Sequence, residues 1–83
     1  MTTKRIQIRL EHGLEARPVA LLVQEASKYD SIIYIQSGDK RVNAKSIMGI
    51  MGLGLDPGKT VTIEVTGEDE EEAITAISEF LEK

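Results

Sequence analysis

The sequence predicts a single α+β domain, an open-faced sandwich in which helices cover one face of a small sheet. Apolar segments of period two alternate with longer segments of helical period, in the order βαββαβα. Two long helices on one small sheet leave the other face without a cover, which favours an open-faced sandwich. With 83 residues the chain supports one modest core, so we expect residues 1–83 to form one domain.

The first half of the chain predicts three strands and one helix. Residues 6–10 alternate apolar and polar side chains, which indicates a strand with one buried face. Apolar residues recur at helical spacing over 16–28. The segment 31–36 is rich in β-branched residues, and Ser-Gly-Asp at 37–39 predicts a hairpin turn into a short strand at 41–43.

The second half predicts a short helix, a strand and a closing helix. Residues 47–53 are apolar and glycine-rich, so a helix there needs tertiary support. Residues 56–59 place proline before glycine, as a type II turn requires, and residues 60–66 alternate as a strand. Asp69 followed by Glu72 resembles a capping box. The apolar stripe of the last helix consists of Ala73, Ile74, Ile77, Phe80 and Leu81.

Composition excludes several classes of function. The net charge of −4 argues against direct binding to nucleic acid, although Lys40, Arg41 and Lys45 form a local basic patch. The chain has no cysteine, which fits a reducing compartment, and its N-terminus lacks the apolar core of a signal peptide. We therefore expect a cytoplasmic protein without membrane contact. No spacing of His, Asp and Glu indicates a metal site, and no motif indicates a cofactor.

The short helix at 47–53 cannot bury all of its apolar side chains. We expect Ile50 and Leu53 in the core, and at least some of Ile47, Met48 and Met51 on the surface. Exposed, flexible methionine is common at docking surfaces. Ser46 directly precedes this helix and is a favoured N-cap, whose hydroxyl can simply accept a backbone N–H two or three residues ahead.

Residues 13–18 place a carboxylate and a guanidinium at the start of the first helix. Open N–H groups and the helix dipole favour an anion there, and Arg17 adds a bidentate donor. Arg17 can form a solvent-exposed ion pair with Glu15, which would contribute little energy. Alternatively, it can bind a phosphate, either across an interface with a partner or on phosphorylated Ser46. His12, the only histidine, is interpreted as a loop residue that ends the first strand.

Two motifs resemble one known family. Residues 13–18 read G-L-E-A-R-P and residues 42–49 read V-N-A-K-S-I-M-G. At this separation the motifs resemble HPr, the small phosphocarrier of the bacterial sugar phosphotransferase system, and the resemblance covers essentially the whole chain. In that family the position of Glu15 holds the phosphate-carrying histidine. The chain is therefore most similar to the regulatory, catabolite-repression HPr-like (Crh) subfamily, which generally has glutamine there, so Glu15 is a departure.

The resemblance implies a fold, a function and partners. The fold would be the HPr-like open-faced β-sandwich, with the helices on one side of four antiparallel strands. The protein would be a non-enzymatic adaptor, phosphorylated on Ser46 by the bifunctional HPr kinase/phosphorylase and acting as corepressor for catabolite control protein A, a LacI-type regulator. Regulatory relatives can form homodimers by exchanging the first strand. The expected interface consists of Glu15, Arg17, Lys45, Ser46, Ile47, Met48 and Met51.

Two other interpretations remain open from the sequence. The first is a phosphoryl carrier of the phosphoenolpyruvate-dependent sugar phosphotransferase system that uses Glu15 or His12 as an atypical acceptor. A carboxylate is a weaker nucleophile than imidazole for exchange with a phosphohistidine, which disfavours Glu15. The second is a ferredoxin-like domain that binds a small ligand in a pocket. A transferred phosphoryl group would support the first, and a ligand pocket the second.

Overall fold

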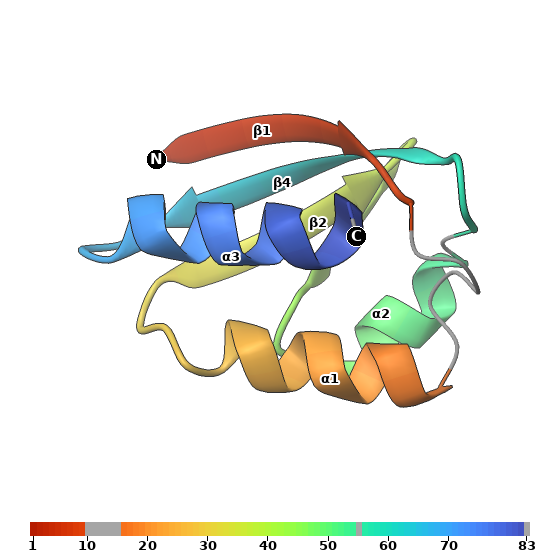
Figure 1. The fold of residues 1–83 in the computed structure, drawn as a ribbon, viewed down its shortest axis with the longest axis horizontal. Coiled ribbons are helices and arrows are strands. Elements are labelled where there is room, and N and C mark those ends of the chain that lie inside the picture. Colours follow the sequence, from red (N-terminus) through yellow and green to blue (C-terminus); the bar gives the residue numbers. More distant parts are fainter. Residues whose placement is uncertain (10–15, 55, 83) are drawn as a thin grey trace.

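The computed structural model describes residues 1–9, 16–54 and 56–82, without the side chains of Ala16 and Arg17. Within these ranges the elements follow the predicted order βαββαβα (Figure 1). The first strand begins before residue 6, because pairing of its backbone with a neighbouring strand does not require apolar side chains.

Four antiparallel strands form one sheet in the order β1-β4-β2-β3. The inner strand β4 (Thr60–Thr66) pairs with β1 (Thr2–Gln7) on one side and with the second inner strand, β2 (Ile32–Ser37), on the other. A tight turn after Ser37 leads to the edge strand β3 (Lys40–Asn43), which pairs with β2. The predicted hairpin between the second and third strands is confirmed.

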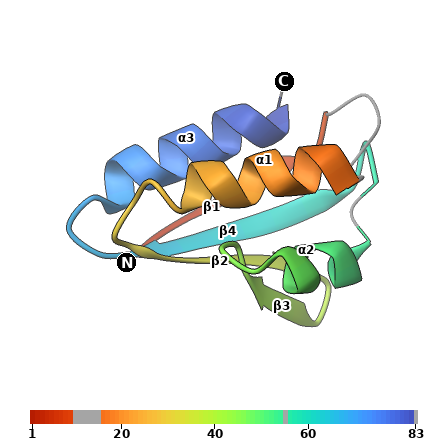
Figure 2. The same cartoon turned by 90° about the horizontal axis from the view of Figure 1, so that it is seen from below.

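Helices cover only one face of this sheet. Figures 1 and 2 show α1 (Ala16–Ala26) and α3 (Glu70–Glu82) side by side over that face, whereas α2 (Ile47–Leu53) lies beside β3 and contacts α1. Helix α1 ends at Ala26, before the predicted limit of residue 28. The predicted open-faced sandwich is confirmed.

The core lies between the helices and the covered face. Alternate residues of each strand point into it, so period two in the sequence becomes a buried row on the sheet. Helices α1 and α3 close this core with stripes at helical spacing. The fully buried side chains include Ile8, Leu22, Ile33, Ile35, Ile50, Ile63, Ile77 and Leu81.

The open face of the sheet carries polar side chains that pair across strands. The Arg41 guanidinium lies 3.9 Å from the centre of the Tyr34 ring, and its Nη2 lies 2.8 Å from a carboxylate oxygen of Glu64. These residues come from β3, β2 and β4, and they alternate with residues that face the core. The arrangement explains why this face needs no covering layer.

The turn between β4 and α3 packs closely against the turn between α1 and β2. Gly67 has a φ of +155°, and a β-carbon at that position would lie 2.7 Å from Cα of Ser31. Beside this contact, both carboxylate oxygens of Asp69 accept backbone N–H groups, from Asp30 at 2.9 Å and from Ser31 at 3.0 Å. The two turns are therefore fixed to each other at the end of the sheet where β4 ends and β2 begins.

The predicted capping box at the start of α3 is wrong. The carboxylate of Asp69 is occupied by Asp30 and Ser31, and it accepts no hydrogen bond from Glu72. Instead, a carboxylate oxygen of Glu70 accepts the Gly67 N–H at 3.3 Å. The acidic first turn still places negative charge at the positive end of the helix dipole, as expected.

Candidate functional site

Ser46 is the N-cap of α2, as the sequence predicts. Its backbone is extended, with φ −110° and ψ 112°, and its Oγ accepts a hydrogen bond from the Gly49 N–H at 3.1 Å. The helix ends at Leu53, and the following Gly54, whose φ of 64° is left-handed, is its C-cap. Two caps thus support a helix that is too short to be stable alone.

The turn before Ser46 is held by its own hydrogen bonds. Asn43 accepts the Lys45 N–H on its side-chain oxygen at 2.8 Å and the Ser46 N–H on its backbone oxygen at 3.0 Å. Ala44 is buried and donates its N–H to the Ile33 carbonyl at 2.8 Å. The position of the Ser46 hydroxyl is therefore set by the end of β3 before any partner or modification is present.

Helix α2 divides its apolar residues between core and surface. Ile50 and Leu53 are buried, as expected. The exposed fractions are 47% for Ile47, 82% for Met48 and 52% for Met51. These three side chains, which we call the α2 patch, lie directly after Ser46 in the chain. A hydroxyl group and an apolar surface thus occur on one short element.

Lys45 lies beside Ser46 in the chain but is engaged elsewhere. Its Nζ donates to the backbone carbonyl of Tyr29 at 2.7 Å, which joins the turn before α2 to the turn after α1. The half-buried Lys45 ammonium therefore fixes this edge of the molecule in the unmodified protein. Sequence alone gives no sign of this contact, because the acceptor is a backbone atom sixteen residues away.

The other predicted interface residues are placed only in part. Glu15 and His12 lie outside the described residues. Arg17 belongs to the first turn of α1, and its side chain is not described. Figures 1 and 2 show this end of α1 and helix α2 at the same end of the molecule. A contact between Arg17 and Ser46 stays a prediction.

A carboxylate cluster that the sequence did not indicate joins the turn before α3 to the turn before β2. The Ser31 hydroxyl donates to Asp69, and together with the Asp30 N–H it lowers the pKa of the Asp69 carboxyl below its ordinary value. The Thr2 hydroxyl donates a hydrogen bond to the Glu70 carboxylate and likewise lowers the pKa of that carboxyl group. Ser31 is buried, so this cluster ties turns together and offers no open ligand site.

Neither a metal site nor a membrane-spanning helix occurs among the described residues. No group of three or more His, Cys, Asp or Glu residues in those ranges is arranged to hold a metal ion. No described helix has both the length and the apolar character that crossing a membrane needs.

Comparisons with known proteins agree on one class, small HPr-like domains of the phosphotransferase system. The sequence model described as "PTS HPr component phosphorylation site" matches residues 2–83. HPr-like protein Crh of Halalkalibacterium halodurans is 48% identical over 83 residues, covering 100% of this chain and 99% of that protein. HPr-like protein Crh of Bacillus subtilis is 42% identical over 83 residues, covering 100% and 98%.

Solved structures give the same result. The phosphocarrier HPr of Bacillus anthracis superposes with a TM-score of 0.95 at 47% identity, covering 98% of this chain and 96% of that one. A crystal structure of Bacillus subtilis Crh, described as a swapped, intertwined dimer, gives 0.79 at 43% identity, covering 98% and 93%. The chain belongs to the HPr family. It is a Crh-type or HPr-like carrier or regulator, and not an enzyme.

Proposed function

We propose that this chain is a regulatory adaptor of carbon-catabolite repression that is switched by phosphorylation of Ser46. The observation that carries this proposal is the Ser46 hydroxyl at the start of α2, next to the exposed Ile47 and Met48. Because the hydroxyl lies beside an apolar docking surface, its phosphorylation would change the charge of the surface that a partner protein contacts. The glutamate at position 15 supports regulation over phosphate transfer, because the family's carrier histidine is absent.

A phosphate on Ser46 would act on recognition and leave the fold in place. It would bring about −1.5 to −2 charges to a residue that now carries a neutral hydroxyl. That charge favours the start of a helix, where backbone N–H groups point outward. A partner would then meet an anion flanked by the α2 patch, and a cationic, apolar surface would bind the modified form selectively.

The partners follow from the family. The kinase would be a bifunctional HPr kinase/phosphorylase that uses ATP, and the reader of the phosphoserine would be catabolite control protein A, a LacI-type regulator. The adaptor would act in the cytoplasm and would itself not contact DNA, consistent with its net charge of −4. Arg17, Lys45 and Glu15 would lie at the edge of the same interface.

A homodimer by exchange of β1 belongs to the same proposal. The crystal structure of Bacillus subtilis Crh is described as a swapped, intertwined dimer. In this chain β1 is an edge strand that pairs with β4 alone, so an exchanged copy could replace it without loss of pairing. Sedimentation across a range of protein concentrations tests whether such a dimer forms.

Titration of the regulator with each form of the adaptor tests the function. The Ser46-phosphorylated chain should bind at least about tenfold more tightly than the unmodified chain, which is about 1.4 kcal/mol. Kinase-treated Ser46→Ala protein should behave as unmodified. Equal affinity of all forms would refute the corepressor role. Arg17→Ala and Glu15→Gln, made singly and together, then measure whether these residues act as a pair.

A phosphoryl carrier with an atypical acceptor is the alternative. The matching family is described by its phosphorylation site, and Glu15 and His12 could in principle receive a phosphoryl group. Incubation with phosphoenolpyruvate and the first enzyme of the phosphotransferase system separates the two functions. We expect no transfer to this chain. A phosphoryl group on Glu15 or His12 would refute the adaptor function and show that the protein is a phosphoryl carrier.

A further inference from the structure

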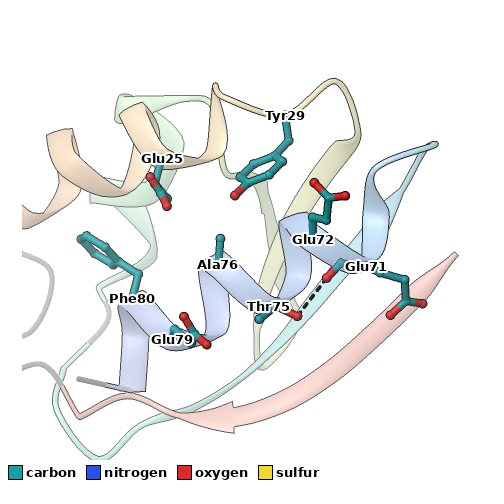
Figure 3. A pocket seen from close by; sticks show the side chains of 8 residues that line it. All are labelled: Glu25, Tyr29, Glu71, Glu72, Thr75, Ala76, Glu79 and Phe80. Carbon is teal, nitrogen blue, oxygen red and sulfur yellow. Dashed lines mark hydrogen bonds between the residues drawn. The ribbon is translucent and has the colours of Figure 1, made fainter.

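A groove of about 660 Å³ lies between the end of α1 and the length of α3, away from the α2 patch (Figure 3). Its walls carry the rings of Tyr29 and Phe80, and Ala76 contributes further apolar surface. Both rings are half-buried and pack against the hydrophobic core. The groove is thus a partly aromatic surface that rests on the core.

Carboxylates surround this aromatic surface. Figure 3 shows the side chains of Glu25 and Glu72 around the same space as the Tyr29 hydroxyl. Glu25 is paired with Lys28, whose Nζ lies at 2.7 Å and whose pKa this carboxylate raises. In the described part of the chain, Glu72 and Glu79 form no salt bridge and accept no side-chain hydrogen bond. Among the described residues, the negative charge of Glu72 and Glu79 is therefore left without a paired cation.

The chemistry of the groove selects a cation with an apolar stem. An anion would be repelled by the glutamates, and a neutral apolar ligand would bury them without a partner. Lysine and arginine combine a methylene stem, which lies well on an aromatic ring, with a charged head that a carboxylate binds. Basic side chains therefore satisfy both parts of the groove together.

The spacing of the free carboxylates indicates a polymer. Glu72 and Glu79 are seven residues apart on α3, which is about two helical turns or roughly 10 Å along the axis. Three residues of polyproline II chain cover about 9 Å and bring side chains three positions apart back to one face. A peptide in this extended conformation, with basic residues three positions apart, would place one charged head near each carboxylate and its basic stems on the aromatic surface.

We propose that the groove between α1 and α3 docks a short, extended, basic segment of a partner protein. Its lysine or arginine stems lie along the Tyr29 ring, and its charged heads pair with Glu72 and Glu79. This surface is separate from the α2 patch, so a partner can occupy it in either phosphorylation state of Ser46. The proposal does not depend on the function assigned to Ser46.

A labelled peptide with two lysines three residues apart, separated by leucine and alanine, tests the groove. Fluorescence anisotropy should show saturable binding, with amide shifts in NMR spectra confined to the end of α1 and to α3. The double variant Glu72→Gln/Glu79→Gln should weaken binding by about five- to tenfold. As a matched control, Asp39→Asn/Glu68→Gln removes the same charge from exposed residues outside the groove and should leave affinity unchanged.

Several outcomes would overturn the proposal. Equal weakening in both double variants would mean general attraction to an acidic protein. Equal binding of a peptide with adjacent lysines would remove the argument from carboxylate spacing. Amide shifts on α2 instead of α3 would place the peptide at a different site. Displacement by spermidine at the peptide's own concentration would show that the groove binds small polyamines. Occupation by a second copy of the chain would make the groove a dimer interface.

Discussion

The residues that precede α2 and α3 use their side chains differently: the first makes a hydrogen bond within its own helix, and the second makes hydrogen bonds to a segment distant in sequence. At α2, the neutral hydroxyl of Ser46 accepts one hydrogen bond from Gly49, within its own helix. Before α3, the carboxylate of Asp69 binds the neighbouring turn at Asp30 and Ser31, which is more than thirty residues away in the sequence. The first contact is local and half-exposed, whereas the second joins two distant turns.

This difference separates a position that can be modified from one that cannot. Modifying Ser46 changes a single local bond and adds charge where a helix start accepts it. Blocking the Ser31 hydroxyl would break a buried contact and bring bulk against Gly67. The chain thus uses one hydroxyl, that of Ser31, in buried structural hydrogen bonding and leaves another, that of Ser46, in a local and modifiable position.

Gly67→Ala should have the largest effect on stability. The new β-carbon would lie 2.7 Å from Cα of Ser31 and 2.9 Å from its Cβ, at a φ that alanine rarely adopts. We expect a loss of about 3 kcal/mol in the free energy of unfolding, measured in urea. Gly52→Ala is the control, because a β-carbon there meets nothing within 4 Å, and it should be neutral or stabilising. A similar loss in both variants would show that the two turns are not tightly packed.

Ser31→Ala should cost about 1 kcal/mol near neutral pH, through loss of one buried hydrogen bond. The cost should depend on pH, because the fold lowers the pKa of the Asp69 carboxyl. A lowered pKa stabilises the fold above the unfolded-state pKa, and this stability is lost as pH falls through the folded-state pKa. Urea curves at neutral pH and near pH 3 should therefore show the difference between variant and parent shrinking in acid. A difference that grows in acid would contradict this role of Asp69.

Removing the α2 cap should have a smaller effect. Ser46→Ala deletes the acceptor of the Gly49 N–H and should destabilise the protein by up to about 1 kcal/mol. Ser46→Asp restores a capping oxygen and should return most of that stability. Thermal unfolding followed by circular dichroism measures both. A loss as large as that of Gly67→Ala would abolish the proposed contrast between the two helix starts.

Met48→Gln should change stability least, within about 0.5 kcal/mol, because its side chain is 82% exposed. Binding of the phosphorylated protein to the regulator should nevertheless weaken about tenfold, as expected for an apolar anchor. Ile32→Thr, a change at an exposed apolar residue on the open face of the sheet, should leave that affinity unaltered. Equal effects of the two substitutions would remove the α2 patch from the interface.

Local patterns in the sequence were sufficient to predict the order of helices and strands, whereas the choice of the HPr-like fold rested on the two family motifs. Period-two segments became β2 and β4, and Pro57-Gly58 became a turn in which Gly58 has a φ of +89° and the Lys59 N–H meets the Asp56 carbonyl. The division of α2 into buried and exposed residues followed from its length. Each of these features depends only on neighbours along the chain.

Contacts between distant residues could not be predicted in the same way. Asp69 followed by Glu72 matches a capping box, but the nearby backbone of Ser31 competes for its carboxylate in the folded chain. Lys45 donates its hydrogen bond to the backbone carbonyl of Tyr29. Because every residue has such a carbonyl, the residue types give no sign of this partner. The groove likewise arises only when α1 and α3 lie together, so no single segment indicates it.

Mass spectrometry after incubation with ATP and HPr kinase/phosphorylase tests the central claim most directly. We expect one added phosphate, located on Ser46, with the buried Ser31 unmodified. Ser46→Ala should gain no phosphate under the same conditions. An unmodified parent protein, in a tube where a known substrate is phosphorylated, would contradict regulation through Ser46, as would phosphate on any other residue.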